Sequence, residues 1–270
     1  MPGYDLKDKH VLVTGAAQGI GRALAERAHA DGARGVTVAD LDVQGAARTA
    51  AAIDGLGIGC DVGDPGEIAS MVAAAEARFG PVDVLCSNAG YTDPPGLLGA
   101  TPRDPGAWRR IVEVNLLAHV WAAELVLPGM VARGEGALLP TISSAALITG
   151  PSGPGYTLTK HGALGFAEWV ALNYGPRGVR VTCLCPNAVW TGMFGRDPED
   201  RTSPPPDAAG LGEVLTPEQV ADAGIDALRE GRFLALPHPR VGVSFGRKGQ
   251  DYDGWIDHTA QRLAKLTASA

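Results

Sequence analysis

The stretch that decides the fold is Val11-Leu12-Val13-Thr14-Gly15-Ala16-Ala17-Gln18-Gly19-Ile20-Gly21. Its first three residues are β-branched or aliphatic, which predicts a strand that is buried on both faces of a parallel sheet. Three glycines follow, and a helical pattern of alanine and leucine begins at residue 23. A strand, a glycine-rich turn and a helix in this order are typical of a dinucleotide-binding site.

Each glycine of this stretch has a separate expected task. Gly15 permits a sharp turn, Gly19 lets the backbone approach a pyrophosphate, and Gly21 lets the helix pack closely on the strand. The N-terminus of the helix offers N–H groups and the positive end of its dipole to the phosphates. The alternative is an ordinary connection between a strand and a helix, in which the glycines are incidental.

The acidic residue Asp40 ends the next strand pattern, which covers residues 35–40. A carboxylate at this place can accept hydrogen bonds from an adenosine ribose, and it repels a 2′-phosphate. No lysine or arginine lies between Gly15 and Gly21, although Arg22 is adjacent. We therefore expect NAD rather than NADP as the cofactor. The alternative for Asp40 is a solvated acid in a loop.

The remainder of the chain alternates between strand and helix patterns. Strands are predicted at 57–62, 82–87, 136–142, 179–185 and 233–236, with long helices at 65–79 and 105–130. This order predicts an α/β protein with a single-domain, Rossmann-like, doubly wound parallel sheet of about seven strands and helices on both faces. We expect one domain over residues 1–270, with a substrate lid at about 192–215 and a C-terminal helical tail at about 243–266.

Composition and charge restrict the class of protein. The 270 residues carry a net charge of −7, which argues against a nucleic-acid partner or an anionic membrane. The four cysteines form no C-x-x-C pair and lie near no histidine cluster, so we expect no metal site and four buried free thiols in a reducing compartment. No signal-peptide pattern and no run of 18 apolar residues is present, so we expect a cytoplasmic protein without a membrane span.

A second chemical motif is Tyr156-Thr157-Leu158-Thr159-Lys160. Positions i and i+4 lie on one face of a helix, so the Tyr156 phenol and the Lys160 ammonium would share one space. The pKa of a free phenol is about 10, and a nearby cation lowers it. The pair then provides a proton acceptor near working pH, as acid–base catalysis requires. The alternative is a surface tyrosine and lysine on an amphipathic helix.

Taken together, the motifs resemble those of the short-chain dehydrogenase/reductase family over about residues 5–240. Each motif is weak alone, but their occurrence in this order and at these spacings is specific. The matching segments are 14–21, Asp61-Val62, Asn88-Ala89-Gly90, Asn115, Ser143-Ser144, 156–160 and Pro186-Asn187-Ala188-Val189-Trp190-Thr191.

The resemblance implies a role for each matching residue. Tyr156 would be the acid–base group, and Lys160 would lower its pKa and bind the nicotinamide ribose. Asn115 would hold a water that links Lys160 to solvent, and a serine would hydrogen-bond the substrate oxygen. The resulting catalytic set is Asn115, Ser144, Tyr156 and Lys160. The residues expected to bind the cofactor are Gly15, Gln18, Gly19, Ile20, Asp40, Leu41, Asp61, Val62, Asn88, Ala89, Gly90, Tyr156, Lys160, Pro186, Val189 and Thr191.

Two positions depart from the family pattern. The family places its serine 13 residues before the tyrosine, where this chain has Ser143, and Ser144 follows one residue later. We prefer Ser144, because tandem serines in the family normally use the second and a one-residue deletion fits the segment that follows; Ser143 is the alternative. At Asn187 the family usually has a glycine, so the local backbone there is expected to differ.

The expected reaction is the NAD-dependent oxidation of a secondary alcohol, or its reverse, by a homotetramer or homodimer formed partly through the helix that bears residues 168–170. The alternatives are an NADP-dependent 3-oxoacyl thioester reductase and a non-catalytic NAD-sensing regulator. We expect a largely apolar or cyclic substrate, because few charges occur among the residues expected near it. These residues are Leu97, Leu98, Leu147, Ile148, Val189, Trp190, Met193 and Phe194.

Overall fold

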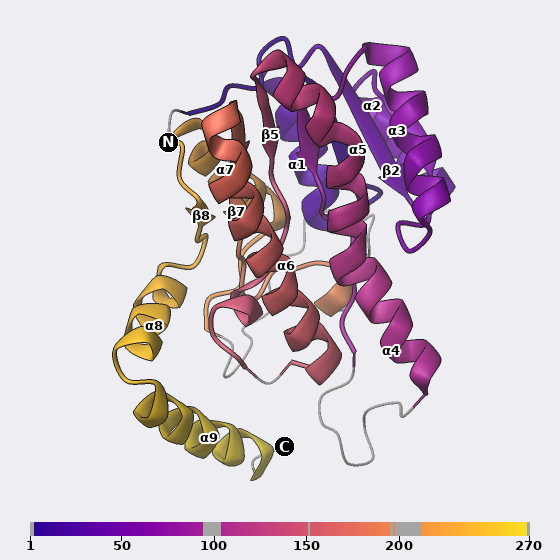
Figure 1. Ribbon diagram of the computed structural model, residues 1–270. Coiled ribbons are helices and arrows are strands. Elements are labelled where there is room, and N and C mark those ends of the chain that lie inside the picture. Colours follow the sequence, from indigo (N-terminus) through magenta and orange to yellow (C-terminus); the bar gives the residue numbers. More distant parts are fainter. Residues whose placement is uncertain (1–2, 94–103, 151, 195–196, 198–211, 269–270) are drawn as a thin grey trace.

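A parallel six-stranded sheet with helices on both faces forms the centre of the structure (Figure 1). The computed structural model describes residues 3–93, 104–150, 152–194, 197 and 212–268. The strand order is β3-β2-β1-β4-β5-β6. The fold class predicted from the sequence is therefore confirmed. The strands are β1 (His10–Thr14), β2 (Gly35–Asp40), β3 (Leu56–Gly59), β4 (Val84–Cys86), β5 (Gly136–Leu138) and β6 (Val179–Val181).

Successive residues of each central strand enter different hydrophobic cores. In β1, Leu12 packs into one core, while Val11 and Val13 pack into the other, and all three side chains are fully buried. This alternation is the period-two geometry of a strand that is covered on both faces. The helices α1 (Gly19–Ala30), α2 (Val43–Ala52) and α7 (Pro217–Arg229) contribute to one core, and α3 (Pro65–Phe79), α5 (Ala118–Arg133) and α6 (Pro154–Tyr174) contribute to the other.

The main sheet has six strands instead of the expected seven, because the strand predicted at 233–236 pairs outside it, and β5 is shorter than predicted. The segment 136–142 contains Pro140, which has no backbone N–H to donate to a sheet ladder. Pairing continues less regularly beyond it, where Leu184 N donates to Pro140 O and Ile142 N donates to Leu184 O. The two following strands, β7 (Cys183–Leu184) and β8 (Leu234–Ala235), form a separate small parallel sheet.

The long helix predicted for residues 105–130 consists of three parts. These are α4 (Pro105–Val112), a π-helical turn (Glu113–Leu117) and α5. We expected no membrane-length apolar segment, but the stretch Pro105–Arg133 contains an 18-residue window with a mean hydropathy of 1.5, so it is long and apolar enough to cross a membrane by length and composition. Half of its most apolar part is buried against the rest of the protein, which is also the pattern of a core helix.

The C-terminal tail contains two helices instead of the expected one. These are α8 (Pro239–Gln250) and α9 (Tyr252–Ala268), which lie beside the small sheet and below it in Figure 1. The break falls at Asp251, whose backbone is extended and whose carboxylate accepts from the Gly254 N–H at 2.9 Å. This side chain therefore starts a new helix, as an N-cap does. Most of the expected lid at 192–215 lies outside the described residues.

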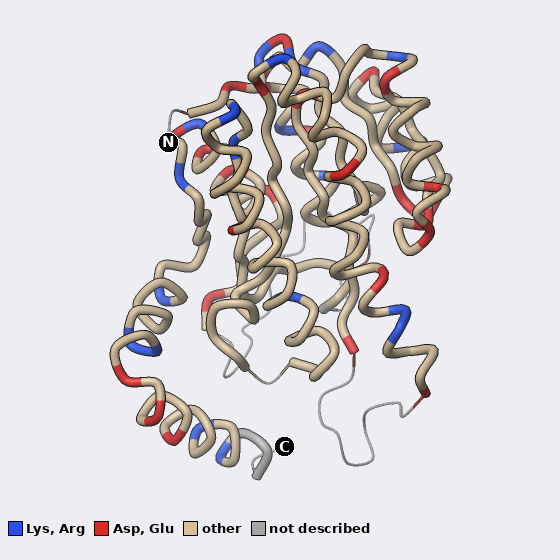
Figure 2. The backbone as a smooth tube through the Cα atoms, viewed as in Figure 1, with Lys and Arg blue, Asp and Glu red and all other residues tan. Residues whose placement is uncertain are grey.

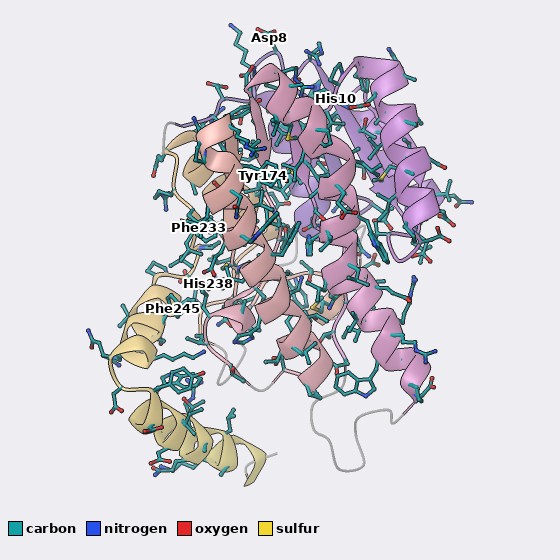
Figure 3. All side chains as sticks on the ribbon, in the orientation of Figure 1. Asp8, His10, Tyr174, Phe233, His238 and Phe245 are labelled. Atoms are coloured by element: carbon teal, nitrogen blue, oxygen red, sulfur yellow. The ribbon has the colours of Figure 1, made fainter. Side chains whose placement is uncertain are left out.

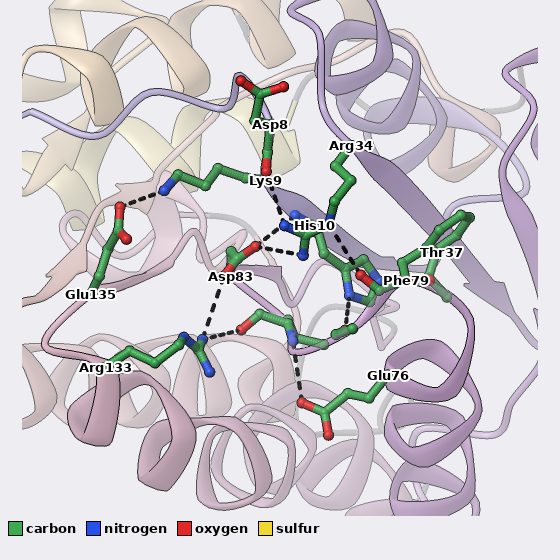
Figure 4. Close-up of polar contacts among 12 residues, drawn as sticks. Asp8, Lys9, His10, Arg34, Thr37, Glu76, Phe79, Asp83, Arg133 and Glu135 are labelled. Atoms are coloured by element: carbon green, nitrogen blue, oxygen red, sulfur yellow. Dashed lines mark hydrogen bonds and ion pairs between the residues drawn. The ribbon is translucent and has the colours of Figure 1, made fainter.

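Charged residues gather at the amino-terminal ends of the strands, at the top of Figure 2, and Figure 4 shows a network of contacts among their side chains. The Asp83 carboxylate accepts from the His10 N–H at 2.9 Å and pairs with Arg34 at 3.1 Å and Arg133 at 3.5 Å. Burial lowers the pKa of His10, and its Nδ1 lies 2.8 Å from Gly80 O. The polar groups at the amino-terminal ends of the strands are therefore paired within the protein. The opposite ends, where the strands finish, are left for ligands.

The strand order reverses direction between β1 and β4, which are neighbours in the sheet but not in the chain. The connections that leave their carboxyl ends go to opposite faces, so a crevice opens between them. Gly15 follows β1 and Asn88 follows β4. The topology therefore brings two of the sequence motifs to one place.

Candidate active site

A cleft of about 720 Å³ lies at this crossover point. Its volume is within the usual range for a small-molecule or cofactor site. Every residue that the sequence analysis assigned to the cofactor lines it, although these residues come from six separate segments of the chain. Among the residues that the structure describes, no group of three or more histidine, cysteine or acidic side chains is arranged to hold a metal ion.

The glycine-rich turn has the geometry that a dinucleotide requires. Gly15 and Gly19 have φ angles of 63° and 57°, which side chains disfavour. A Cβ at Gly15 would lie 2.7 Å from Ala89 Cα, and one at Gly21 would lie 2.1 Å from Gly15 O. Both contacts are too close, so only glycine lets the turn, the helix and the β4 loop pack together. The turn and the N-terminus of α1 therefore fit a pyrophosphate.

Asn88 joins the turn to two other strands. Its amide nitrogen donates to Thr14 O at 3.0 Å and to Gly15 O at 3.2 Å, and its side-chain oxygen accepts from the Thr141 hydroxyl at 2.9 Å. The backbone N–H groups of Asn88 and Ala89 both donate to the Thr14 hydroxyl. The ends of β1, β4 and β5 are thereby fixed relative to one another.

Two acidic residues line the cleft where β2 and β3 end. The Asp40 carboxylate accepts from the N–H groups of Ala17 and Asp42, both at 2.9 Å, which orients it at the end of β2. The Asp61 carboxylate pairs with Arg110 at 2.6 Å, and this contact lowers the pKa of Asp61. Arg110 also lines the cleft; it was not predicted from the sequence, because nothing in its helical pattern distinguishes it from Arg109.

Lys160 is nearly fully buried at the other end of the cleft. Its ammonium donates to Thr141 O at 3.0 Å, and burial lowers its pKa to about 8. A lysine is rarely buried unless it is paired, and the Thr141 carbonyl provides a partner for the ammonium. An amine in this position suits hydrogen bonding to sugar hydroxyls.

The Tyr156 phenol opens into the same cleft one helical turn away. Burial raises its pKa, and a hydrogen bond with Ser143 lowers it by a smaller amount. The expected lowering of this pKa by Lys160 is therefore wrong for the described arrangement. The physical reason is that the Lys160 ammonium lies beside the ring, 5.6 Å from its centroid, and donates to a carbonyl.

The two serines have different surroundings. Ser143 lines the cleft and hydrogen-bonds with Tyr156, whereas Ser144 donates to the Asn187 side-chain oxygen at 3.1 Å and does not line the cleft. This arrangement favours Ser143 over Ser144, the serine that was preferred from the sequence. Ser143 also has a φ angle of 148°, which is strained for a residue with a side chain. The strained backbone turns Ser143 toward the cleft and Ser144 toward Asn187, the residue that replaces the usual glycine.

Asn115 is fully buried and lies behind the cleft in the π-helical turn. Its side-chain oxygen accepts from Tyr91 N at 3.0 Å, and its nitrogen donates to Tyr91 O at 2.7 Å. The side chain thus holds the loop that follows β4, and the expected water remains a prediction. A π turn interrupts the regular helical hydrogen bonds, and such turns are frequent at functional sites.

The residues expected near the substrate divide into three groups. Val189 and Met193 line the cleft, as expected. Leu147, Ile148 and Trp190 do not line it, and the Leu147 side chain is only 1% exposed and packs in the core. Leu97, Leu98 and the side chain of Phe194 lie outside the described part of the chain. Tyr91 and Thr92 line the cleft but were not expected to do so individually.

A carboxylate from a distant loop caps the helix that carries Tyr156. The helix begins after Gly153, which has no side chain to cap it. Instead, Asp93 accepts from Gly155 N at 2.9 Å and from Tyr156 N at 2.8 Å. An acid is favourable at a helix N-terminus, where unpaired N–H groups and the positive dipole end meet. The one signal of this contact in the sequence is Gly153, which stands at the N-cap position but has no side chain to accept from the first turn of the helix.

The fold and this cleft define a dinucleotide-binding α/β protein with a buried lysine beside a tyrosine. Comparison with known proteins gives the family: the model described as short chain dehydrogenase matches residues 9–202. The chain belongs to this family.

Similar proteins support this assignment over most of the chain. The (+)-borneol dehydrogenase 1 of Salvia officinalis is 32% identical, over 82% of this chain and 86% of its own. The 1-deoxy-11-beta-hydroxypentalenate dehydrogenase of Streptomyces exfoliatus is 34% identical, over 84% and 82%. A solved short chain dehydrogenase/reductase from Burkholderia phymatum in complex with NAD is 26% identical, covers 93% of this chain and 96% of its own, and has a TM-score of 0.79.

The Asp93 cap leads to a testable prediction. In Asp93→Ala, the amide hydrogens of Gly155 and Tyr156 should exchange faster with solvent, and the free energy of unfolding should fall by about 1 kcal/mol. Hydrogen exchange and urea unfolding measure the two effects. Asp64→Ala is the matched control, because the Asp64 carboxylate also accepts from two N–H groups in the first turn of a helix, α3. It should lower stability equally without changing exchange at the Tyr156 helix; equal exchange at Gly155 in both variants would contradict the cap.

Proposed function

We propose that this protein is an NAD-dependent oxidoreductase that interconverts a secondary alcohol and a ketone on a largely apolar or cyclic small molecule. One observation carries the proposal: Tyr156, Ser143 and Lys160 lie together in a cleft that also contains the glycine-rich turn. A regulator that only senses NAD has no need for these three side chains together. Family membership supports the broader conclusion of an alcohol or ketone oxidoreductase.

Each of the three side chains has a separate task in the proposed reaction. In the oxidation direction, the Tyr156 oxygen takes the hydroxyl proton of the substrate, and the Ser143 hydroxyl donates to the same substrate oxygen. Lys160 would hold the nicotinamide ribose, and its charge would favour the ionised tyrosine once the phenol and the ribose share it. The bound cofactor supplies the hydride chemistry. The protein therefore contributes position and electrostatics.

Because the pKa of Tyr156 is raised, we expect this phenol to lose its proton only when the cofactor is bound in the cleft. A buried phenol resists ionisation because water no longer solvates the anion. The positive charge of an oxidised nicotinamide ring would offset that desolvation. Binding of the cofactor and loss of the proton are then coupled, which favours the order cofactor first and alcohol second.

The preference for NAD rests on the charges around the adenosine side. Among the described residues, the basic side chains that line the cleft are Arg110 and Lys160. Arg110 is paired with Asp61, and Lys160 donates to Thr141 O. A 2′-phosphate would therefore meet the Asp40 carboxylate without a cation committed to it. The NADP-dependent thioester reductase is less favoured for the same reason.

Two lines of support point to an apolar or cyclic substrate. The described residues on the substrate side include Tyr91, Val189 and Met193, which offer aromatic and apolar contacts. The similar dehydrogenases named above act, by their names, on borneol and on a hydroxypentalenate, both of which are cyclic alcohols. We propose the same class of substrate for this chain.

The first functional prediction separates the two serines. With a panel of borneol, cyclohexanol and 2-butanol, Tyr156→Phe should lower kcat/KM by about 10³-fold and Ser143→Ala by about 10²-fold, because each loses a group that contacts the reacting oxygen. Formation of NADH absorbance measures the rates. Ser144→Ala is the matched control, and its kcat/KM should stay within about threefold of wild type. A reversed order of the two serine variants would return the role to Ser144.

The second prediction concerns the cofactor. The kcat/KM for NAD should exceed that for NADP by at least about tenfold, which corresponds to ~1.4 kcal/mol. In Asp40→Asn, which keeps the shape of the side chain, the ratio of kcat/KM for NAD to that for NADP should decrease, because the repulsion of the 2′-phosphate is lost. Initial rates measured with each cofactor give this ratio. Faster turnover with NADP in wild type, together with reduction of acetoacetyl-CoA, would favour the thioester reductase.

The exposed apolar side chains of α6 support an oligomer. Leu158, Trp169 and Leu172 are 54%, 53% and 77% exposed, although each is large and apolar. Such side chains are favoured at interfaces between subunits. We propose a homotetramer or homodimer through this helix.

Light scattering of the wild type should give a mass that is a multiple of the chain mass. Trp169→Glu should lower the measured mass, and Phe245→Glu on α8 is the control. A monomeric wild type would exclude this interface.

A further inference from the structure

The side chain of Lys248 is buried on a helix that is otherwise mostly exposed. Lys248 is 7% exposed, whereas its neighbours Arg247 and Gly249 are exposed. Its ammonium donates to Leu147 O at 2.9 Å and lies 5.3 Å and 4.9 Å from the ring centroids of Tyr252 and Trp255. A backbone carbonyl from the body of the protein and two rings from α9 therefore surround one cation.

The carbonyl that Lys248 contacts ends the short turn that begins at Ser143. Within this turn, Leu147 N and Ile148 N donate to Ser144 O, and Ala146 N donates to Ser143 O. The Ser143 hydroxyl itself accepts from Ala145 N at 3.1 Å. A strained φ angle persists only when the surrounding contacts hold it. Lys248 supplies such a contact at the far end of the turn.

The start of α8 is fixed to the opposite side of the cleft. The His238 Nδ1 accepts from Asn187 N at 3.1 Å, and its Nε2 donates to Ala188 O at 3.2 Å. Asn187 lines the cleft beside Val189. His238 and Phe245 mark the course of α8 in Figure 3. One helix therefore connects the serine turn to the loop that follows β7.

We propose that Lys248 is a positioning residue for Ser143, through which the C-terminal helices α8 and α9 hold the serine turn in its strained conformation. The proposal rests on the proposed function, because it assigns importance to the place of the Ser143 hydroxyl. The tail thereby becomes part of the machinery that orients the alcohol. The cofactor turn, at the other end of the cleft, does not depend on it.

The position of Leu147 O and of the two aromatic rings suits a lysine side chain. An ammonium on a flexible stem can reach a carbonyl while its charge rests against aromatic faces. An uncharged side chain of the same length fills the space but leaves Leu147 O without its donor. The turn then loses a hydrogen bond to a charged group, which is among the stronger kinds.

The test uses hydrogen exchange together with steady-state kinetics on the full-length protein. In Lys248→Met, amide exchange in a peptide covering residues 142–150 should be about tenfold faster than in wild type. A peptide covering residues 10–30 should be unchanged. For cyclohexanol or borneol, kcat should fall and KM should rise, for a combined loss of about tenfold in kcat/KM. The KM for NAD should stay as in wild type.

Two further variants separate positioning from general loss of structure. Lys248→Arg keeps a cation and a donor and should recover most of the protection and most of kcat/KM. Arg247→Met removes the same charge from an exposed neighbour on the same helix and should behave as wild type. Unchanged protection of 142–150 in Lys248→Met, or a loss of protection that is equal in every peptide, would overturn the proposal.

The exchange and kinetic measurements together show whether the positioning role of Lys248 fails or the proposed oxidoreductase function fails. If no alcohol in the panel is oxidised by wild type, the proposed function fails, while the exchange result still decides whether Lys248 holds the turn. If wild type is active and the turn loosens in Lys248→Met without any change in kcat/KM for the alcohol, the positioning role is refuted and the function stands.

Discussion

The hydrogen bonds of Asn88 are the interaction on which the rest of the site depends. Its amide donates to Gly15 O, and its oxygen accepts from Thr141, whose own carbonyl accepts from Lys160. A continuous path therefore joins the cofactor turn to the buried ammonium. Because the path uses backbone carbonyls at the ends of β1 and β5, it fixes the distance between the two halves of the cleft. A side chain of another shape at Asn88 would leave several buried polar groups unpaired.

Burial controls the acid–base chemistry more strongly than the neighbouring charge does. It raises the pKa of Tyr156 and lowers the pKa of Lys160 to about 8, so both groups are shifted toward their neutral forms. Both groups line one cleft, so a charge that enters the cleft acts on the protonation of each. In the proposed reaction, a cationic nicotinamide ring beside Tyr156 would offset the effect of burial and let the phenol act as a proton acceptor.

The segments that surround Tyr156 are held by residues far away in the sequence. Asp93 caps its helix, Asn115 holds the backbone of Tyr91, and Lys248 contacts the end of the serine turn. In our proposal, Lys248 helps to keep the strain at Ser143, and the strained backbone places the Ser143 hydroxyl rather than that of Ser144 in the cleft. The arrangement agrees with the general rule that strained residues at functional sites are supported by surrounding contacts.

The sequence by itself determined the fold class, the segments that form the cofactor cleft, and the place of Tyr156 and Lys160 on one helix. These follow from local rules: hydrophobic periodicity, glycines where side chains cannot fit, and the i, i+4 geometry of a helix. The tertiary structure alone decided that Ser143 rather than Ser144 faces the cleft, that burial raises the pKa of Tyr156, and that the tail breaks at Asp251. Each of these depends on contacts between residues distant in the chain, such as Lys248 with Leu147, and on the desolvation that packing imposes, which no local pattern records.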